Sequence, residues 1–358
     1  MLELQSVCVE FSTEGGPIRP VDQVFLTINQ GERHVIIGET GSGKSVLLMS
    51  ILGLSGGNVT GHILWNGKEL VGLSPKVYNQ IRGKEIAYIP QGNSSGFNPL
   101  MRIGTQIAES LRIHLKLGRA EAHTYAVDAL RKLDFQEPEY WVSRYPHQLS
   151  GGMKQRALVA MGTIAGGQLL LADEPTKGLD EERRGDVINL FDELSRTFTK
   201  EKISLLCVTH DLYFAKKIAT HIHVMYAGQI LESSSCEEFF WSPLHPYSQM
   251  MINSLPEHGF QYPKGFAPSH EEYDGLGCRF AGAGGLLSRK AARSGSGRKA
   301  GAVSPCFSKQ ITSRKPIPAD FSAARRSPLC KTPASPSVMG KPWASSGRAV
   351  AERRHWPI

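Results

Sequence analysis

The feature that most constrains the fold is the run at residues 38–45, Gly-Glu-Thr-Gly-Ser-Gly-Lys-Ser. It follows a β-branched segment, residues 35–37, and precedes an apolar segment, residues 45–52, that predicts a helix. In this strand–turn–helix order the glycines let backbone N–H groups surround phosphates, and the helix N-terminus adds the positive end of its dipole. The run predicts a nucleoside-triphosphate site formed by Gly38, Glu39, Thr40, Gly41, Ser42, Gly43, Lys44 and Ser45.

Within this site, Lys44 is expected to neutralise the β- and γ-phosphates and the Ser45 hydroxyl to bind Mg²⁺. Asp173 follows the apolar residues 169–172, which predict a buried strand, and open α/β sheets bind ligands at the carboxyl ends of their strands. Asp173 is therefore the second predicted Mg²⁺ ligand. Glu174 is expected to act as the general base that polarises the attacking water.

A second glycine-rich element, residues 149–156, reads Leu-Ser-Gly-Gly-Met-Lys-Gln-Arg and precedes Asp173. It opens a segment of good helix formers, residues 153–164, so a serine hydroxyl and two glycine amides meet at a helix N-terminus. This is a second anion site, and one triphosphate rarely needs two such sites from one subunit. Its candidate residues are Ser150, Gly151, Gly152 and Gln155.

With these elements in this order, the chain resembles the nucleotide-binding subunits of ABC transporters. The resemblance implies an α/β P-loop fold with a parallel-sheet core, an N-terminal antiparallel β part and a helical subdomain at about residues 92–150. It also implies that two cassettes pair head to tail as a homodimer or a heterodimer, so that each glycine-rich signature closes on the other subunit's ATP. Asp180 would lie at that dimer interface.

The same resemblance assigns roles to three further residues. His210, after the apolar run 203–208, would contact the γ-phosphate and orient the water. Gln91, after the short strand 86–89, would contact the metal and the water. Phe11, at the end of a strand over residues 7–11, would stack on adenine, although a core phenylalanine is the competing interpretation.

Group-level patterns resemble the importer ATPases for peptides and nickel: residues 97–104 after Gln91, Tyr-Pro-His-Gln at 145–148, and Pro-Leu-His-Pro-Tyr-Ser at 243–248. This resemblance implies an ATPase domain at residues 1–240 and a C-terminal extension at 241–280. The implied partners are two integral membrane permease subunits and an extracytoplasmic solute-binding protein, which place the chain peripherally on the cytoplasmic face of the cell (inner) membrane. Peptides and nickel or metal–chelator complexes both remain open as substrates.

Two other classes of protein compete with the importer. An exporter subunit stays open because nucleotide chemistry does not set the direction of transport. A soluble ATPase acting on DNA would interrupt the cassette with a long coiled coil, and the segment between Gln91 and Ser150 shows no sustained heptads. No apolar stretch approaches the ~20 residues that span a bilayer, so membrane location is expected to come from a partner.

Charge divides the chain near residue 281. Residues 281–358 contain 15 Lys/Arg and only Asp320 and Glu352 as acids, whereas residues 1–280 hold 26 Lys/Arg and 31 Asp/Glu, a net charge of −5. The acidic body argues against a nucleic-acid partner. The basic Gly/Ala/Ser/Pro/Arg tail predicts disorder, and its abrupt start favours a frameshift near codon 281 over a genuine tail that binds anionic lipid.

The cysteines give neither a disulfide framework nor a convincing cluster site. Cys8 and Cys207 lie in predicted strands and are interpreted as buried apolar residues. Gly-Cys-Arg-Phe at 277–280 resembles the start of the iron–sulfur motif of peptide-importer ATPases, but only Cys306 and Cys330 follow it. Because a cluster generally takes four ligands, we expect none in this chain, and ATP and Mg²⁺ are the predicted cofactors.

Overall fold

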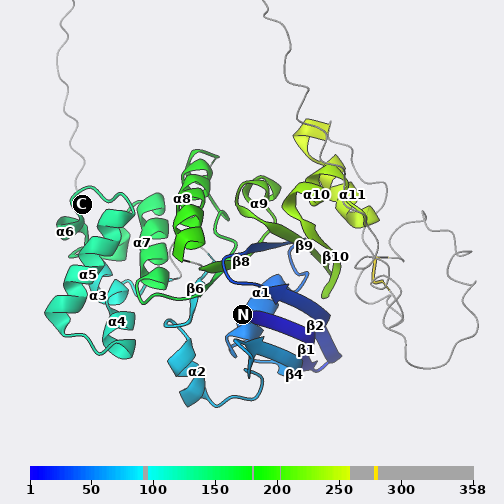
Figure 1. Cartoon of the computed structure of the whole chain (residues 1–358), viewed down its shortest axis with the longest axis horizontal. Helices are drawn as coiled ribbons and strands as arrows, with labels where there is room; N and C mark the ends of the chain where they lie inside the picture. Colours follow the sequence, from blue (N-terminus) through cyan, green and yellow to red (C-terminus); the bar gives the residue numbers. More distant parts are fainter. Residues whose placement is uncertain (92–95, 180, 202, 259–277, 281–358) are drawn as a thin grey trace, which may run out of the picture. The chain divides into compact units, whose positions relative to one another are not determined.

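A computed structural model describes residues 1–91, 96–179, 181–201, 203–258 and 278–280, which belong to one compact unit (Figure 1). The expected tail at 281–358, its proposed frameshift and Asp180 lie outside the described residues. No described helix combines the length and the apolar character needed to cross a membrane.

The N-terminal part is an antiparallel sheet, as expected, and its strand order is β2-β1-β4-β5. Its strands are β1 (Leu2–Thr13), β2 (Gly16–Ile28), β4 (Asn58–Trp65) and β5 (Lys68–Glu69). In β1 the buried positions change parity, from Leu2 and Leu4 to Val7 and Val9. The change coincides with a register shift at Ser6, whose φ is 52°, so a bulge keeps both halves of the strand facing one core.

The second sheet has the strand order β10-β9-β3-β8-β7-β6. Its strands are β3 (Arg33–Ile37), β6 (Ile86–Ile89), β7 (Leu169–Asp173), β8 (Ser204–Thr209), β9 (His221–Tyr226) and β10 (Gln229–Ser235). The five strands from β9 to β6 are parallel, as predicted, whereas β10 pairs with β9 antiparallel. At this edge Ala227 and Gly228, both with positive φ, form a two-residue hairpin turn that reverses the chain.

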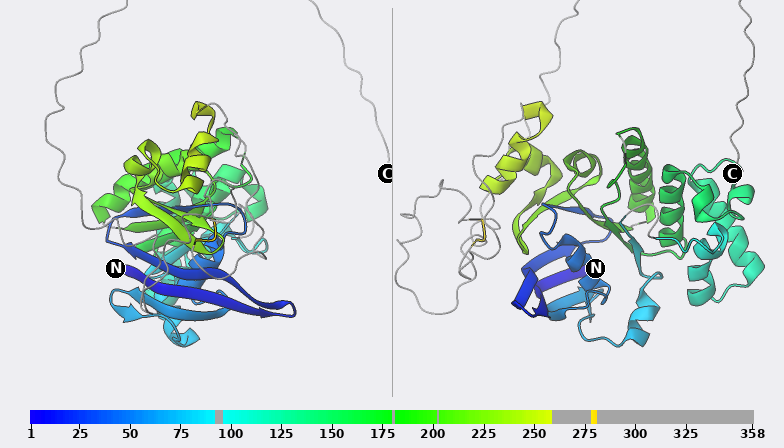
Figure 2. Two further views of the ribbon diagram at one scale, coloured as in Figure 1. Left: turned by 90° about the vertical axis from the view of Figure 1, so that its right-hand side faces the viewer. Right: turned by 180° about the vertical axis from the view of Figure 1, so that it is seen from behind.

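Alternate residues of the parallel strands face two different cores. Ile36, Leu206 and Leu171 pack with α1 (Lys44–Ile51) and the antiparallel sheet. Val35, Leu205 and other residues of opposite parity face the helical side. Helix α1 therefore lies between the sheets, and the first residues after β3 are fixed by packing on both faces (Figure 1, Figure 2).

The remaining helices are α2 (Pro75–Ile81), α3 (Ile103–Ile107), α4 (Glu109–His114), α5 (Arg119–Lys132), α6 (Pro138–Trp141), η1 (Pro146–Gln148), α7 (Gly151–Thr163), α8 (Glu181–Glu201), α9 (Leu212–Ile218), α10 (Cys236–Trp241), α11 (Pro246–Asn253) and η2 (Pro256–His258). Helices α3 and α4 are short and meet at Ala108, which caps both. Helix α7 packs against α3 and α5 as well as against β6 and α8. It therefore joins the helical part, which lies at the left in Figure 1, to the sheet.

Candidate active site

Strand register brings the predicted catalytic residues to one edge of the parallel sheet. Asp173 is level with Val208 in β8, and Ile37 is level with Thr209. The turn after β3, the acidic pair after β7 and His210 therefore leave the sheet at neighbouring positions. Gln91 leaves β6 at the same edge, because Ile89 is level with Ala172.

The glycine-rich turn at residues 38–43 is held against β2 and β9 by contacts that admit no side chain. A Cβ at Gly43, where φ is 100°, would lie 1.9 Å from the carbonyl oxygen of Pro20. A Cβ at Gly38 would lie 2.1 Å from the carbonyl oxygen of Met225. Glycine is required at both positions, so this cradle of backbone amides is a built feature of the fold.

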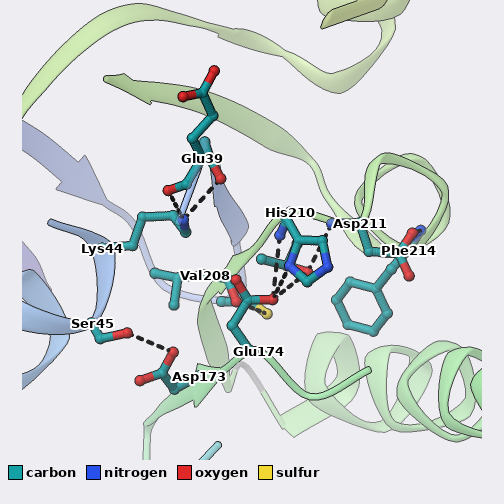
Figure 3. Close-up of polar contacts among 12 residues, drawn as sticks. Glu39, Lys44, Ser45, Asp173, Glu174, Val208, His210, Asp211 and Phe214 are labelled. Atoms are coloured by element: carbon teal, nitrogen blue, oxygen red, sulfur yellow. Dashed lines mark hydrogen bonds and ion pairs between the residues drawn. The ribbon is translucent and has the colours of Figure 1, made fainter. Parts of the chain in front are cut away.

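The ammonium of Lys44 lies within this cradle. Its Nζ donates to the carbonyl oxygens of Gly38 and Glu39, each at 2.8 Å (Figure 3). Burial lowers the pKa of Lys44, and the nearby carboxylates of Glu174 and Asp173 oppose that effect. Its Nζ also lies 3.4 Å from Ser42 Oγ, so the groups that hold this buried cation belong to one loop, and the cation can turn to a phosphate with little reorganisation.

Ser45 and Asp173 present two oxygen ligands on facing elements. The Ser45 hydroxyl donates to Asp173 Oδ1 at 3.0 Å, and the Tyr88 hydroxyl lies 3.4 Å from Oδ2. Burial raises the pKa of Asp173, the Ser45 hydrogen bond opposes the rise, and the adjacent Glu174 adds to it. A hydroxyl and a carboxylate fit Mg²⁺, which prefers oxygen ligands and would lower the electrostatic cost of this buried acid.

Glu174 has an unusual backbone and a buried carboxylate. Its φ of 47° is left-handed, which is costly for a residue other than glycine, and its N–H donates to the Val208 carbonyl at 2.9 Å. Glu174 Oε2 lies 2.8 Å from His210 Nδ1 and 3.3 Å from Thr209 Oγ1 (Figure 3). No local sequence pattern indicates this strained conformation, which points the carboxylate at β8.

Asp211, which was not predicted as a site residue, fixes the segment that carries His210. Its carboxylate accepts from the Phe214 N–H at 2.9 Å, which caps α9, and forms an ion pair with Arg184 of α8 at 2.7 Å. The sequence pattern that could have predicted this role is an aspartate directly after His210 and directly before a helix, which is a preferred capping position. Tyr88 was also missed, although it lies in the short strand that leads to Gln91.

The C-terminal extension contacts the phosphate loop. Tyr247 of α11 is fully buried, and the nearby Glu39 carboxylate adds to burial in raising the pKa of its phenol. Its ring lies 4.9 Å from that of Tyr226 and 5.3 Å from that of Phe280, measured between centroids. The extension therefore reaches the rim of the candidate nucleotide site, a relationship that no local pattern predicted.

The glycine-rich signature opens α7. Ser150 is exposed and its Oγ accepts from the Met153 N–H at 3.3 Å, so the hydroxyl lies at a helix N-terminus. Gly151 and Gly152 form the first turn of that helix. Gln155, in contrast, is buried within its own chain and does not share the exposed surface of Ser150.

Phe11 is half-buried at the edge of the antiparallel-sheet core. Its ring lies beside Gly57, where a Cβ would be 3.0 Å from Phe11 Cζ. The structure thus places Phe11 near the core, and its proposed adenine contact stays a prediction. The two cysteines that were expected to be buried in strands differ. Cys207 is buried as expected, whereas Cys8 is half-buried.

Comparison with known proteins identifies two regions of the chain. Residues 21–177 match the ABC transporter family, and residues 231–283 match the family described as oligopeptide/dipeptide transporter, C-terminal region. The oligopeptide transport ATP-binding protein OppD of Bacillus subtilis is 38% identical over 260 residues, which are 72% of each protein. The chain belongs to this family of ABC transporter ATP-binding proteins.

Other relatives of this ABC ATPase agree. The dipeptide transport ATP-binding protein DppD of Escherichia coli is 37% identical over 260 residues, covering 72% of this chain and 79% of the relative. The ABC cassette MJ0796, in a dimeric structure bound to ADP and Pi, has a TM-score of 0.59 at 24% identity and covers 66% of this chain and 99% of its own. This likeness shows the shared fold, and the family assignment makes the chain an ATPase.

Proposed function

We propose that this ABC ATPase powers the uptake of peptides through a partner membrane permease. The observation that supports its ATPase part is the single sheet edge that gathers Lys44, Asp173 and the Glu174–His210 pair. Peptides are proposed as the substrate because the relatives are named for oligopeptide and dipeptide transport and because residues 231–283 match the C-terminal region of that family.

In the proposed reaction, residues 38–45 hold the phosphates of ATP through backbone amides and the Lys44 ammonium. Ser45 and Asp173, with Gln91 from the adjacent strand, would hold Mg²⁺, which supplies charge neutralisation of the phosphates. Glu174 accepts a proton from water as the water oxygen bonds to the γ-phosphorus and the bond to the β-phosphate bridging oxygen breaks. ADP and phosphate are released. His210 orients the Glu174 carboxylate and reaches toward the γ-phosphate from its partly exposed side.

The complete site is proposed to form between two subunits. Ser150, Gly151 and Gly152 would present a hydroxyl and amides to the nucleotide held by the other subunit, with Gln155 buried behind them as a packing residue of α7. Asp180 would lie at the same interface. Phe11 would stack on adenine. The second subunit is either another copy of this chain or a related ATPase.

The wider assembly follows from the family. We infer two integral membrane permease subunits and an extracytoplasmic solute-binding protein, with this chain bound peripherally on the cytoplasmic face of the cell membrane. ATP and Mg²⁺ are its proposed cofactors, and no iron–sulfur cluster is expected in this chain. The acidic body of residues 1–280 disfavours nucleic acid as a partner.

Reconstitution with the partner permease in proteoliposomes tests this function. Addition of the solute-binding protein loaded with a peptide should stimulate ATP hydrolysis and peptide accumulation, and a Glu174→Gln chain should support neither. Nickel or a nickel–chelator complex in place of peptide should give no stimulation. Stimulation by nickel alone would reject the peptide assignment, and ATP-driven movement in the opposite direction would identify an exporter.

A further inference from the structure

Three histidines and one glutamate lie close together near the sheet edge opposite the nucleotide site; they are His34, His221, His223 and Glu32. His34 lies near the amino end of β3, His221 begins β9, and Glu32 lies just before β3. The His34 Nε2 and Glu32 Oε2 atoms are 2.9 Å apart. The rings of His34 and His221 stack with centroids 4.6 Å apart. One ligand atom from each of Glu32, His34 and His221 lies within 4.8 Å of the others.

The hydrogen bonds of His221 leave one ring nitrogen suited to bind a cation. The Thr220 hydroxyl donates to the Arg33 carbonyl oxygen at 2.9 Å, so its proton is already used. The Thr220 hydroxyl oxygen must therefore accept a hydrogen bond from His221 Nδ1–H, and the two atoms Oγ1 and Nδ1 are 3.1 Å apart. In that tautomer His221 Nε2 carries a lone pair. His221 is half-buried, and one of its ring nitrogens lies within 4.8 Å of the ligand atoms of Glu32 and His34.

His34 is supported in the same way by a buried chain. Its Nδ1 lies 2.8 Å from His223 Nε2, and His223 Nδ1 lies 2.8 Å from the Ser233 hydroxyl. Each of these three groups can donate or accept a hydrogen bond. His34 Nδ1–H can therefore donate to His223 Nε2, and His223 Nδ1–H can donate to the Ser233 hydroxyl. His34 Nε2 then carries a lone pair that faces the Glu32 carboxylate. A cation between these two groups is favourable, whereas a lone pair facing a carboxylate is not.

Glu32 is held in place by its own partners. The Asn29 N–H donates to Glu32 Oε2 at 2.8 Å, and the Asn29 side-chain amide donates to Oε1 at 3.1 Å. These two bonds hold the Glu32 carboxylate beside His34, so that an ion bound by His34 Nε2 would also meet Glu32 Oε2.

We propose that Glu32, His34 and His221 form a binding site for a zinc-class divalent transition-metal ion. Two imidazole nitrogens and one carboxylate oxygen favour Zn²⁺, Co²⁺, Ni²⁺ or Cu²⁺ over Mg²⁺, so the site is chemically distinct from the nucleotide site. Three protein ligands leave a fourth position for water. A bound ion would connect the segment before β3 to the start of β9. It would thereby stabilise the pairing of these two strands, whose opposite ends lead to the phosphate loop and to the hairpin turn that contacts this loop.

The test is a titration of the tag-free, full-length protein, treated with EDTA and desalted, with Co²⁺ and Zn²⁺. One Co²⁺ per chain should bind with a visible spectrum of nitrogen and oxygen ligation and without the sulfur charge-transfer bands that cysteine ligation gives. His221→Ala and Glu32→Gln should each weaken binding at least about tenfold. Zn²⁺ should raise the melting temperature of the parent protein and not that of either variant.

His62→Ala is the matched control. His62 Nδ1 lies 2.7 Å from Glu69 Oε2, so it forms an exposed His–Glu pair outside the proposed site. This variant should bind Co²⁺ as the parent does. Unchanged affinity in both His221→Ala and Glu32→Gln, a purely thiolate spectrum, or no binding at about 1 mM metal would each overturn the proposal. Circular dichroism in the presence of EDTA shows whether each variant is folded. If one variant misfolds, the other still tests the site.

Discussion

His210 Nδ1 lies 2.8 Å from Glu174 Oε2, and the His210 backbone N–H is 3.3 Å from the same oxygen. The carboxylate accepts, so His210 carries its proton on Nδ1 and presents Nε2 on the partly exposed side of its ring. A single residue after β8 thus holds the proposed base through both its backbone and its side chain. This relationship makes Glu174 and His210 one functional unit.

Glu174→Gln should retain ATP binding and lose hydrolysis by about 10²–10⁴-fold, because an amide cannot take the proton of the attacking water. ATP-bound closed dimers should accumulate, which size-exclusion chromatography detects. Glu237→Gln, at an exposed position of α10, is the matched control and should hydrolyse ATP normally. Near-parental turnover by Glu174→Gln in the presence of its partner would remove Glu174 from the role of base.

Lys44→Ala should weaken ATP binding at least about tenfold, because a charge-assisted hydrogen bond to phosphate is worth about 1.5–3 kcal/mol. In the variant, the carbonyl oxygens of Gly38 and Glu39 would also lose the hydrogen bonds that Lys44 donates to them, and they would face the negatively charged nucleotide without a cation between. Isothermal titration calorimetry measures the change. Lys132→Ala, on the exposed end of α5, should bind ATP as the parent does. Equal affinities for the two variants would contradict the assignment of Lys44.

Ser150→Arg tests action across the dimer. The variant's own phosphate loop should still bind ATP, while the site that Ser150 completes should fail, since a bulky cation replaces a hydroxyl beside the γ-phosphate. In a homodimer, mixing with Lys44→Ala chains should expose this asymmetry in single-turnover hydrolysis. In a heterodimer the variant should silence the partner's site. Normal hydrolysis in every pairing would exclude Ser150 from the composite site.

Asp211→Ala should destabilise the fold by about 2 kcal/mol, because it removes the cap of α9 and leaves Arg184 without its carboxylate partner. Asp211→Asn retains a capping oxygen and should cost about half as much. Urea unfolding followed by circular dichroism gives both values. If the two variants are equally stable, the cap of α9 contributes nothing and the whole cost comes from the lost ion pair with Arg184.

Truncation after Phe280 should leave ATP hydrolysis unchanged, because the residues that form the candidate site all precede it. If the basic tail is a frameshift product, another reading frame of the same DNA should encode closely spaced cysteines directly after Phe280. The match to the transporter C-terminal region ends at residue 283, which supports this proposal. Resequencing without such a frame would reject the frameshift, and loss of activity on truncation would show that the tail contributes.

The sequence by itself determined the features that depend on neighbouring residues. The strand–turn–helix order around Lys44 requires glycines with positive φ, and the apolar residues before Asp173 require a buried strand; both requirements are local and visible in the order of residues. The fold class and its two sheets were implied by the family resemblance that these local motifs carry.

Only the tertiary structure decided what the register between strands brings together. Glu174 meets His210 because β7 and β8 are parallel neighbours with Asp173 level with Val208. The antiparallel edge at β10, the packing of Tyr247 beside Glu39 and the stacking of His34 on His221 depend on pairings between distant segments. Such pairings are set by the joint burial of whole strands and helices, and no window of sequence contains them.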